Sequence, residues 1–165
     1  MGIRNMGLKK GIKLKLKEKA GAKGHHVFTL HNIHTGEDIV FEYDNLIPTT
    51  AHEMNAKRWV GTGNDCDMTY GAVGTSVVAP LPGDTILGTE LARKILSARS
   101  NSSNQAFFTT YFGPTEANGI LTEFALFGEA ASASVDTGTM GCHSVIAVTK
   151  SSSFTMTIES TITFS

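Results

Sequence analysis

Cysteine is scarce in this 165-residue chain: Cys66 and Cys142 stand far apart, and neither has a second cysteine near it. This spacing excludes a C-x-x-C metal or redox pair and leaves no disulfide framework to infer. The chain also lacks an apolar run long enough to span a bilayer, and its charged N-terminus lacks the apolar stretch of a signal peptide. We therefore expect two free thiols in a reducing compartment, in a soluble, unexported protein that does not contact a membrane.

Net charge is nearly absent as well, at −1, but the charges are unevenly distributed along the chain. Residues 1–24 hold eight Lys/Arg and one acid, a net +7, whereas residues 25–165 hold six Lys/Arg and fourteen acids, a net −8. The sequence therefore predicts a basic N-terminal arm over 1–24 and a single-domain body over 25–165. A body of this length can bury a real hydrophobic core.

The arm contains a short stretch, residues 12–17, in which apolar and basic residues alternate strictly. One face of an extended strand carries the apolar side chains and the other the lysines: Ile12, Leu14 and Leu16, then Lys13, Lys15 and Lys17. So short a strand is unstable alone, and we expect it to add to a sheet edge of its own body or of a neighbouring subunit. The glycine-rich stretch over 20–24 is expected to be a flexible connector that permits such exchange.

Two other interpretations of the arm stay open. Lysine-rich termini are commonly unstructured, solvated tails. Alternatively, the lysines neutralise the phosphates of a nucleic acid. The arm has no aromatic residue for base stacking and no arginine beyond Arg4, so sequence-specific readout of DNA is not expected from it.

The stretch over 70–93 is predicted to be a structural joint, a strand that feeds an irregular loop. Glycines free the backbone to turn or to approach a neighbour closely, and prolines fix φ and remove donors. The residues that define the joint are Gly71, Gly74, Pro82, Asp84, Glu90 and Arg93. Glu90 and Arg93, three residues apart on an apolar segment, are expected to pair and brace the loop rather than to do chemistry.

The same stretch carries a resemblance to known proteins. A G-x-x-G-T segment, a proline turn and D-T-x-L-x-x-E-x-x-R precede a G-I-L-T-E-F-A-L-F strand and a Thr-rich last strand. This pattern, over residues 46–164, resembles small virion proteins of tailed bacteriophages, of the tail, baseplate, fibre-associated or head-decoration type. The matching residues are Gly71, Gly74, Thr75, Asp84, Thr85, Leu87, Glu90, Arg93, Gly119, Glu123 and Phe127. The resemblance implies an assembly protein with no catalytic residues to carry over.

Hydrophobic periodicity predicts a mainly β body. Strands are expected over 25–33, 38–43, 106–112, 120–127, 142–149 and 154–164, and one helix from a cap at Thr49 or Thr50 to about Val60. Turns are expected at 34–37, at Asp44-Asn45 and over the polar stretch 100–105, and residues 130–139 are expected to be a mobile loop or a surface contact. Residues 120–127 are apolar on both faces apart from Glu123, which is typical of a central strand or of one covered by another subunit. Six to eight strands with one short helix indicate an antiparallel β-sandwich of jelly-roll or Greek-key type.

Residues that carry chemistry are present but scattered. His25, His26, His31, His34 and His52 fall close together, yet no Asp, Glu or Cys completes a ligand pattern, so we interpret them as surface and turn histidines. His143 follows Cys142, but neighbours on a strand point to opposite faces and cannot pair. Asp65, Asp67, Asp84 and Glu90 converge only if the fold brings their loops together. The sequence therefore predicts no catalytic residue, no metal site and no cofactor.

We expect a non-enzymatic structural protein of a tailed-phage virion, assembled in the host cytoplasm as a homo-oligomeric ring or trimer in the tail, baseplate or neck. Its expected partners are other copies of itself and other virion proteins of the tail, neck or capsid. The alternatives are a capsid decoration or cement protein and, outside that class, a nucleic-acid-binding module that uses the basic arm.

Overall fold

The computed structural model describes residues 21–62 and 67–165, and within them the chain is mainly β, with nine strands in two antiparallel sheets and one short helix. Most of the predicted arm, including the predicted strand over 12–17, lies outside the described residues. So do Asp65 and Cys66. The mainly β prediction is confirmed.

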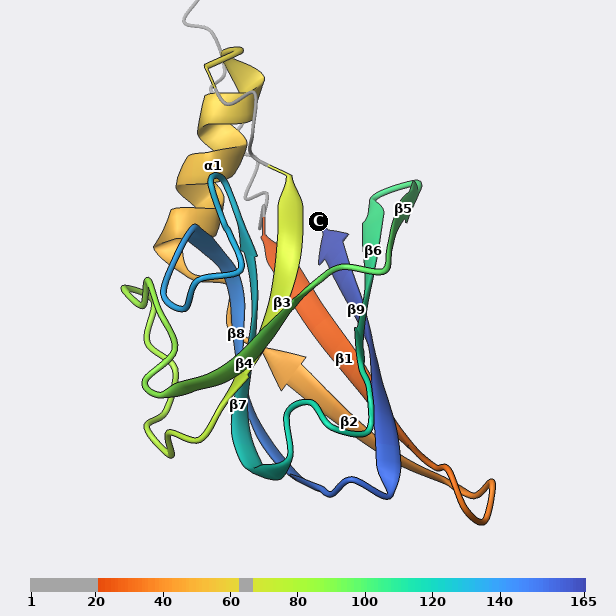
Figure 1. The fold of residues 1–165 in the computed structure, drawn as a ribbon. Coiled ribbons are helices and arrows are strands. Elements are labelled where there is room, and N and C mark those ends of the chain that lie inside the picture. Colours follow the sequence, from red (N-terminus) through yellow and green to blue (C-terminus); the bar gives the residue numbers. More distant parts are fainter. Residues whose placement is uncertain (1–20, 63–66) are drawn as a thin grey trace, which may run out of the picture.

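The strands form two sheets that face each other (Figure 1). The first sheet has the order β2-β1-β9-β6-β5, with β1 Ala22–Asn32, β2 Asp38–Asn45, β5 Ala98–Ser102, β6 Gln105–Phe112 and β9 Phe154–Phe164. The second has the order β4-β3-β7-β8, with β3 Met68–Gly74, β4 Glu90–Ile95, β7 Gly119–Gly128 and β8 Thr139–Lys150. Every pairing between neighbouring strands is antiparallel.

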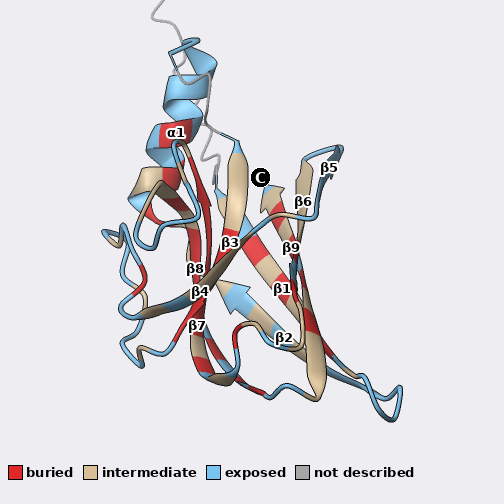
Figure 2. Cartoon of the chain, in the orientation of Figure 1, coloured by how far each residue is buried: buried red, intermediate tan, exposed pale blue. Residues whose placement is uncertain are grey.

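The main core lies between the inner faces of the two sheets (Figure 2). Strand alternation supplies it, because successive side chains point to opposite faces. In β9, Met156, Ile158 and Ile162 are buried, whereas the threonines between them are half-buried, which confirms the predicted half-buried strand. Phe28 of β1 packs edge-on against Phe124 of β7, with 5.5 Å between ring centroids, and so ties the sheets together. Each fully buried large side chain stabilises the fold by roughly 1.5–3 kcal/mol.

Strand β7 is buried on both faces because the protein's own loops cover the outer face of the second sheet. Phe124 belongs to the main core, whereas Phe127 belongs to a second, smaller cluster with Leu87 and Met140. Leu87 comes from the 75–89 loop, and Ala131 of the 129–138 loop packs on the same cluster. Both loops lie on the side of the second sheet that faces away from the first (Figure 1). Of the two explanations for the apolar run, the structure fits a central strand.

The predicted helix is present as α1, Thr49–Trp59, but its predicted cap is wrong. The N-cap position is Pro48, and no side chain caps the helix. Thr50 lies inside the first turn, where its hydroxyl donates to the carbonyl of Met140 at 2.8 Å. The threonine therefore docks α1 on β8 instead of satisfying the helix's own amides.

Strands extend into three segments where the sequence predicted turns or a connector. Residues 22–24 begin β1 and pair with β9, and Gly21 exchanges backbone hydrogen bonds of 2.7 and 2.8 Å with Ser165. Residues 100–102 belong to β5, and Asp44-Asn45 ends β2. In each case a neighbouring strand satisfies the backbone, so pairing overrides a Ser-, Asn- or Gly-rich composition. Of these three changes only β5 adds a strand, which brings the count in the described residues to nine rather than six to eight.

His26 is buried in the core, which corrects its interpretation as a surface histidine. Its Nδ1 lies 2.8 Å from the hydroxyl of Ser160, and its Nε2 lies 3.7 Å from the sulfur of Cys142. Burial lowers the pKa of His26 to about 3 and raises the pKa of the Cys142 thiol to about 11. Both groups are therefore neutral at pH 7, and the contact is a packed polar pair rather than a thiolate–imidazolium dyad. His25 and His31 lie at the surface as expected, beside Asp44 and Asp38.

We predict that His26 makes the protein less stable as the pH falls from 7 to 5. The unfolded chain protonates this imidazole below its usual pKa, near 6.5, whereas the folded protein does not protonate it until the pH nears 3. The free energy of unfolding is therefore about 2 kcal/mol lower at pH 5 than at a pH well above the pKa of the unfolded chain's imidazole. Urea denaturation across this pH range should show a flatter profile for His26→Gln than for the parent protein.

The exposed His31→Gln is the matched control and should keep the parent's slope. The ion pairs Lys94–Glu116 and Lys57–Glu129 contribute little to this slope, because the lysines hold the pKa values of Glu116 and Glu129 below their usual range. The stabilisation that these two carboxylates give the folded protein is lost only at lower pH, where the same carboxylates become protonated in the unfolded chain. An unchanged slope in His26→Gln would contradict the assignment.

Candidate functional site

The outer face of the second sheet brings together most residues of the joint. Two loops cross this face, 75–89 between β3 and β4 and 129–138 between β7 and β8. Each loop is held by one cluster of polar side chains that are buried, apart from the partly exposed Asp84. The first cluster is Glu123, His143 and Asp84, and the second is Glu90 and Arg93.

Glu123 is the anchor of the 75–89 loop. Its side chain is 1% exposed, and its carboxylate accepts hydrogen bonds from three backbone amides of that loop. Ser76 N and Thr89 N donate to Oε1 at 3.1 and 2.9 Å, and Gly88 N donates to Oε2 at 2.9 Å. The register between β7 and β8 shifts between Leu121 and Glu123, and such a bulge re-aims a side chain. Leu121 thus faces the core while Glu123 reaches the loop.

The glycines of the G-x-x-G-T segment allow close approach. A Cβ on Gly74 would lie 2.3 Å from Oε1 of Glu123, and a Cβ on Gly71 would lie 2.2 Å from the hydroxyl of Thr110 in the facing sheet. No real Cβ contact is that short, so a side chain at either position would displace its neighbour. Gly74 therefore makes room for the carboxylate anchor, and Gly71 lets the two sheets meet.

His143 links the anchor to the middle of the loop. Its Nδ1 lies 2.9 Å from Oδ2 of Asp84, and its Nε2 lies 3.4 Å from Oε2 of Glu123. The same Asp84 oxygen accepts the amide of Leu81 at 2.7 Å. An imidazole thus stands between two carboxylates, and His143 is almost fully buried. Because these carboxylate oxygens also hold loop amides, we interpret the row as a structural tie.

The sequence pattern singled out Asp84 and Glu123 but did not indicate that His143 lies with them. It placed Cys142 and His143 on opposite faces of one strand, and the structure agrees: Cys142 lies in the main core, whereas His143 lies with the loop anchors. The β7–β8 register pairs Glu123 with Val145, so His143 is a diagonal cross-strand neighbour of Glu123. That register was the missing signal. Among the described residues no group of His, Cys, Asp and Glu is arranged to hold a metal ion.

The Glu90–Arg93 pair holds the second loop. Both side chains are buried, at 1% and 2% exposure, and they meet through two short hydrogen bonds of 2.5 and 2.6 Å. The guanidinium stacks over Phe127, with 4.8 Å from its carbon to the ring centroid. It also donates to the carbonyls of Ser132 and Thr137 at 3.1 and 2.9 Å. The 129–138 loop, expected to be mobile or a surface contact, is tied to this cation.

The rest of the joint is more exposed. Pro82 lies at the surface, and its carbonyl accepts the amide of Thr49, which connects the loop to the start of α1 at 2.8 Å. The 75–89 loop also presents large apolar side chains to solvent: Val77 at 82%, then Val78, Leu81 and Ile86. A backbone fixed from beneath by buried polar groups therefore displays an apolar outer surface.

Replacing Glu123 with glutamine should destabilise the protein by about 2–4 kcal/mol, because an amide nitrogen would face buried backbone donors that the carboxylate now satisfies. Urea denaturation at pH 7 measures the change. Glu159→Gln, at an exposed glutamate of β9, is the matched control and should stay within about 0.5 kcal/mol of the parent. Equal stability of Glu123→Gln and the parent would show that the loop does not depend on this anchor.

Replacing Arg93 with alanine should cost roughly 3–5 kcal/mol of unfolding free energy, because it leaves the Glu90 charge buried and unpaired. The double change Glu90→Leu with Arg93→Met should recover part of that loss. The control is Arg58→Ala, which breaks the exposed pair with Asp67 and should cost about 1 kcal/mol or less. A single Arg93→Ala variant as stable as the parent would refute the bracing role.

The part of the chain that the structure describes contains no helix of the length and apolarity needed to cross a membrane. Comparison of the chain with known protein families, with curated proteins and with solved structures finds no match. The function is therefore inferred from the residues and their geometry.

Proposed function

We infer that this protein is a non-enzymatic structural component of a tailed-phage virion, located in the tail, baseplate or neck and assembled in the host cytoplasm as a homo-oligomer. The phage assignment rests on the resemblance carried by the joint. Several of the residues that carry the resemblance lie at the two anchoring clusters, with Gly74, Asp84 and Glu123 around one loop and Glu90 and Arg93 beside the other. The jelly-roll or Greek-key subtype of the two-sheet fold remains part of this proposal.

The observation that carries the proposal is the apolar outer surface of the 75–89 loop. Contiguous apolar side chains on a surface mark interaction sites. Val77, Val78 and Leu81 are all more than half exposed, while the backbone that bears them is held by Glu123 and Asp84. A surface that is already ordered loses little conformational entropy when a partner covers it. These features suit a permanent subunit contact with another virion protein.

The predicted strand over 12–17 supplies a second contact, between copies of the chain. Its apolar face of Ile12, Leu14 and Leu16 must be buried against another surface. Full burial stabilises the contact by roughly 1.5–3 kcal/mol per side chain. The +7 arm and the −8 body attract each other, which favours association at low salt. Each arm that crosses to a neighbour ties one subunit to the next.

Deleting residues 1–19 should leave a folded, soluble body while abolishing or weakening the oligomer. Light scattering gives the mass, and urea denaturation verifies that the body still folds. The substitution Leu14→Asn, on the apolar face of the predicted strand, should weaken association. Its control is Lys15→Gln on the charged face, which should not. An unchanged oligomeric mass after the deletion would refute the role of the arm.

Experiments on phage particles test the assignment of the protein to a virion. Virions that lack this protein should be defective in assembly or infectivity, and its copy number distinguishes a tail or neck component from a capsid decoration protein, which is far more abundant. A monodisperse monomer at high concentration, together with intact infectious virions that lack the protein, would overturn the proposal. Duplex DNA binding that weakens steeply with salt would favour the nucleic-acid alternative.

A further inference from the structure

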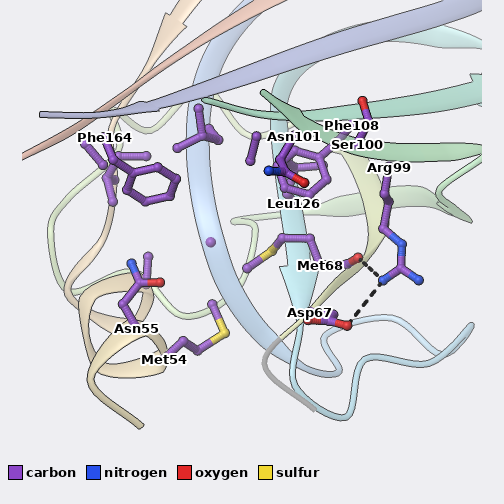
Figure 3. A pocket seen from close by; sticks show the side chains of 16 residues that line it. Met54, Asn55, Asp67, Met68, Arg99, Ser100, Asn101, Phe108, Leu126 and Phe164 are labelled. Atoms are coloured by element: carbon purple, nitrogen blue, oxygen red, sulfur yellow. Dashed lines mark hydrogen bonds and ion pairs between the residues drawn. The ribbon is translucent and has the colours of Figure 1, made fainter. Parts of the chain in front are cut away.

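A cavity opens between the two sheets beside the end of the first sheet (Figure 3). Its volume of about 390 Å³ falls in the range of ligand sites. The lining is largely apolar, with Met54 from α1, Met68 from β3, Phe108 from β6 and Leu126 from β7. Polar groups stand at one side, where Arg99 donates to the carbonyl of Met68 and lies 3.9 Å from Asp67.

The free edge of β5 borders this cavity. Arg99, Ser100 and Asn101 of β5 line it, and all five residues of the strand are exposed. Within the described residues β5 pairs on one side only, with β6. A strand at the end of a sheet presents unpaired amides and carbonyls, which form a template for another strand. At the opposite end of this sheet, the chain at the end of β2 is tied to β8, since Leu46 bridges to His143 and Tyr43 exchanges hydrogen bonds with the backbone of Ala147.

We propose that the β5 edge and the cavity beside it form the acceptor site for residues 12–17 of a neighbouring copy. The proposal rests on the proposed function and names the surface that receives the arm. Added beside β5, the strand directs Ile12, Leu14 and Leu16 toward the cavity and its lysines toward solvent. The two strands are similar in length, with six residues in the arm and five in β5.

The reach of the chain favours a neighbour's arm over the protein's own arm. β1 is flanked by β2 and β9, so the arm cannot fold back onto β1 as a hairpin. A strand outside β5 would lie four strand spacings from β1, or about 19 Å. The four steps from Lys17 to Gly21 span at most about 14 Å. Measured along the sheet, the protein's own arm therefore falls short of the β5 edge, while an arm from another copy has no such limit.

The other end strand at this side of the molecule is a poorer acceptor. Three of the nine residues that line the cavity beside β4 are charged, Arg93, Lys94 and Glu116, against two of sixteen at the β5 cavity. Charged groups disfavour an incoming apolar side chain. Leu91 of β4 is partly exposed and provides the control position for an experiment.

Disulfide trapping in the full chain tests the site. All variants carry Cys66→Ser, and Cys142 is fully buried. Copies with Leu14→Cys are mixed with copies that carry either Asn101→Cys on β5 or Leu91→Cys on β4, and products are separated on non-reducing gels. The expected result is an interchain dimer between Leu14→Cys and Asn101→Cys as the major product, with little from the Leu91→Cys mixture. Asn101 is exposed at the cavity rim, so the substitution is compatible with folding.

The outcomes separate the two proposals. Loss of the oligomer on deletion of residues 1–19, combined with trapping at Leu91→Cys or at neither position, would overturn the β5 site and leave the arm as a subunit contact. An oligomer unaffected by the deletion would overturn both. A doubly substituted chain, Leu14→Cys with Asn101→Cys, that forms only an intrachain disulfide would show that each arm folds onto its own body and would overturn the exchange.

Discussion

The burial of one carboxylate organises the outer half of this molecule. Glu123 lies in β7 with almost no exposed surface, and a charge in that position is tolerated only when hydrogen bonds replace water. Three amides of the 75–89 loop provide those hydrogen bonds, and the imidazole of His143 lies 3.4 Å away. The loop therefore folds over the second sheet and brings Leu87 onto its outer face. The same interaction stabilises the charge, orders the loop and buries β7 from both sides.

Two kinds of packing follow from this arrangement. Between the sheets the core is apolar, and strand alternation determines which residues enter it. On the outer face the loops are held by charged side chains that satisfy backbone groups, with a small apolar cluster beneath them. Glu90 and Arg93 repeat the principle of Glu123 at the other loop, since each buried charge is also bonded to backbone that lacks a strand partner.

Local patterns in the sequence predict much of this fold, because period and spacing are local properties. Alternation identifies the β1–β2 hairpin and β9, and a spacing of three residues suggests the Glu90–Arg93 pair. The Asp84–His143 contact, in contrast, joins residues 59 apart. It depends on the pairing of β7 with β8, which places His143 beside Glu123, and on the path of the 75–89 loop over that sheet, and neither is a local property of the sequence. Strand β5 was misjudged for a related reason: its Ser- and Asn-rich composition is typical of a turn, but β6 satisfies its backbone.

The two ends of the first sheet differ, and this difference constrains how copies of the chain can associate. The chain at the end of β2 is tied to β8, whereas the whole of β5 is open beside a largely apolar cavity. Donor and acceptor surfaces are therefore different parts of the chain, which makes a one-way exchange heterologous. Repeated head-to-tail, such a contact closes into a ring when the rotation per subunit divides a full turn, and otherwise extends as a filament. The anchored loops do not determine that rotation. They do fix the position of the apolar surface at 77–86 relative to the acceptor edge of β5. Every copy in the assembly would therefore present this apolar surface in the same orientation.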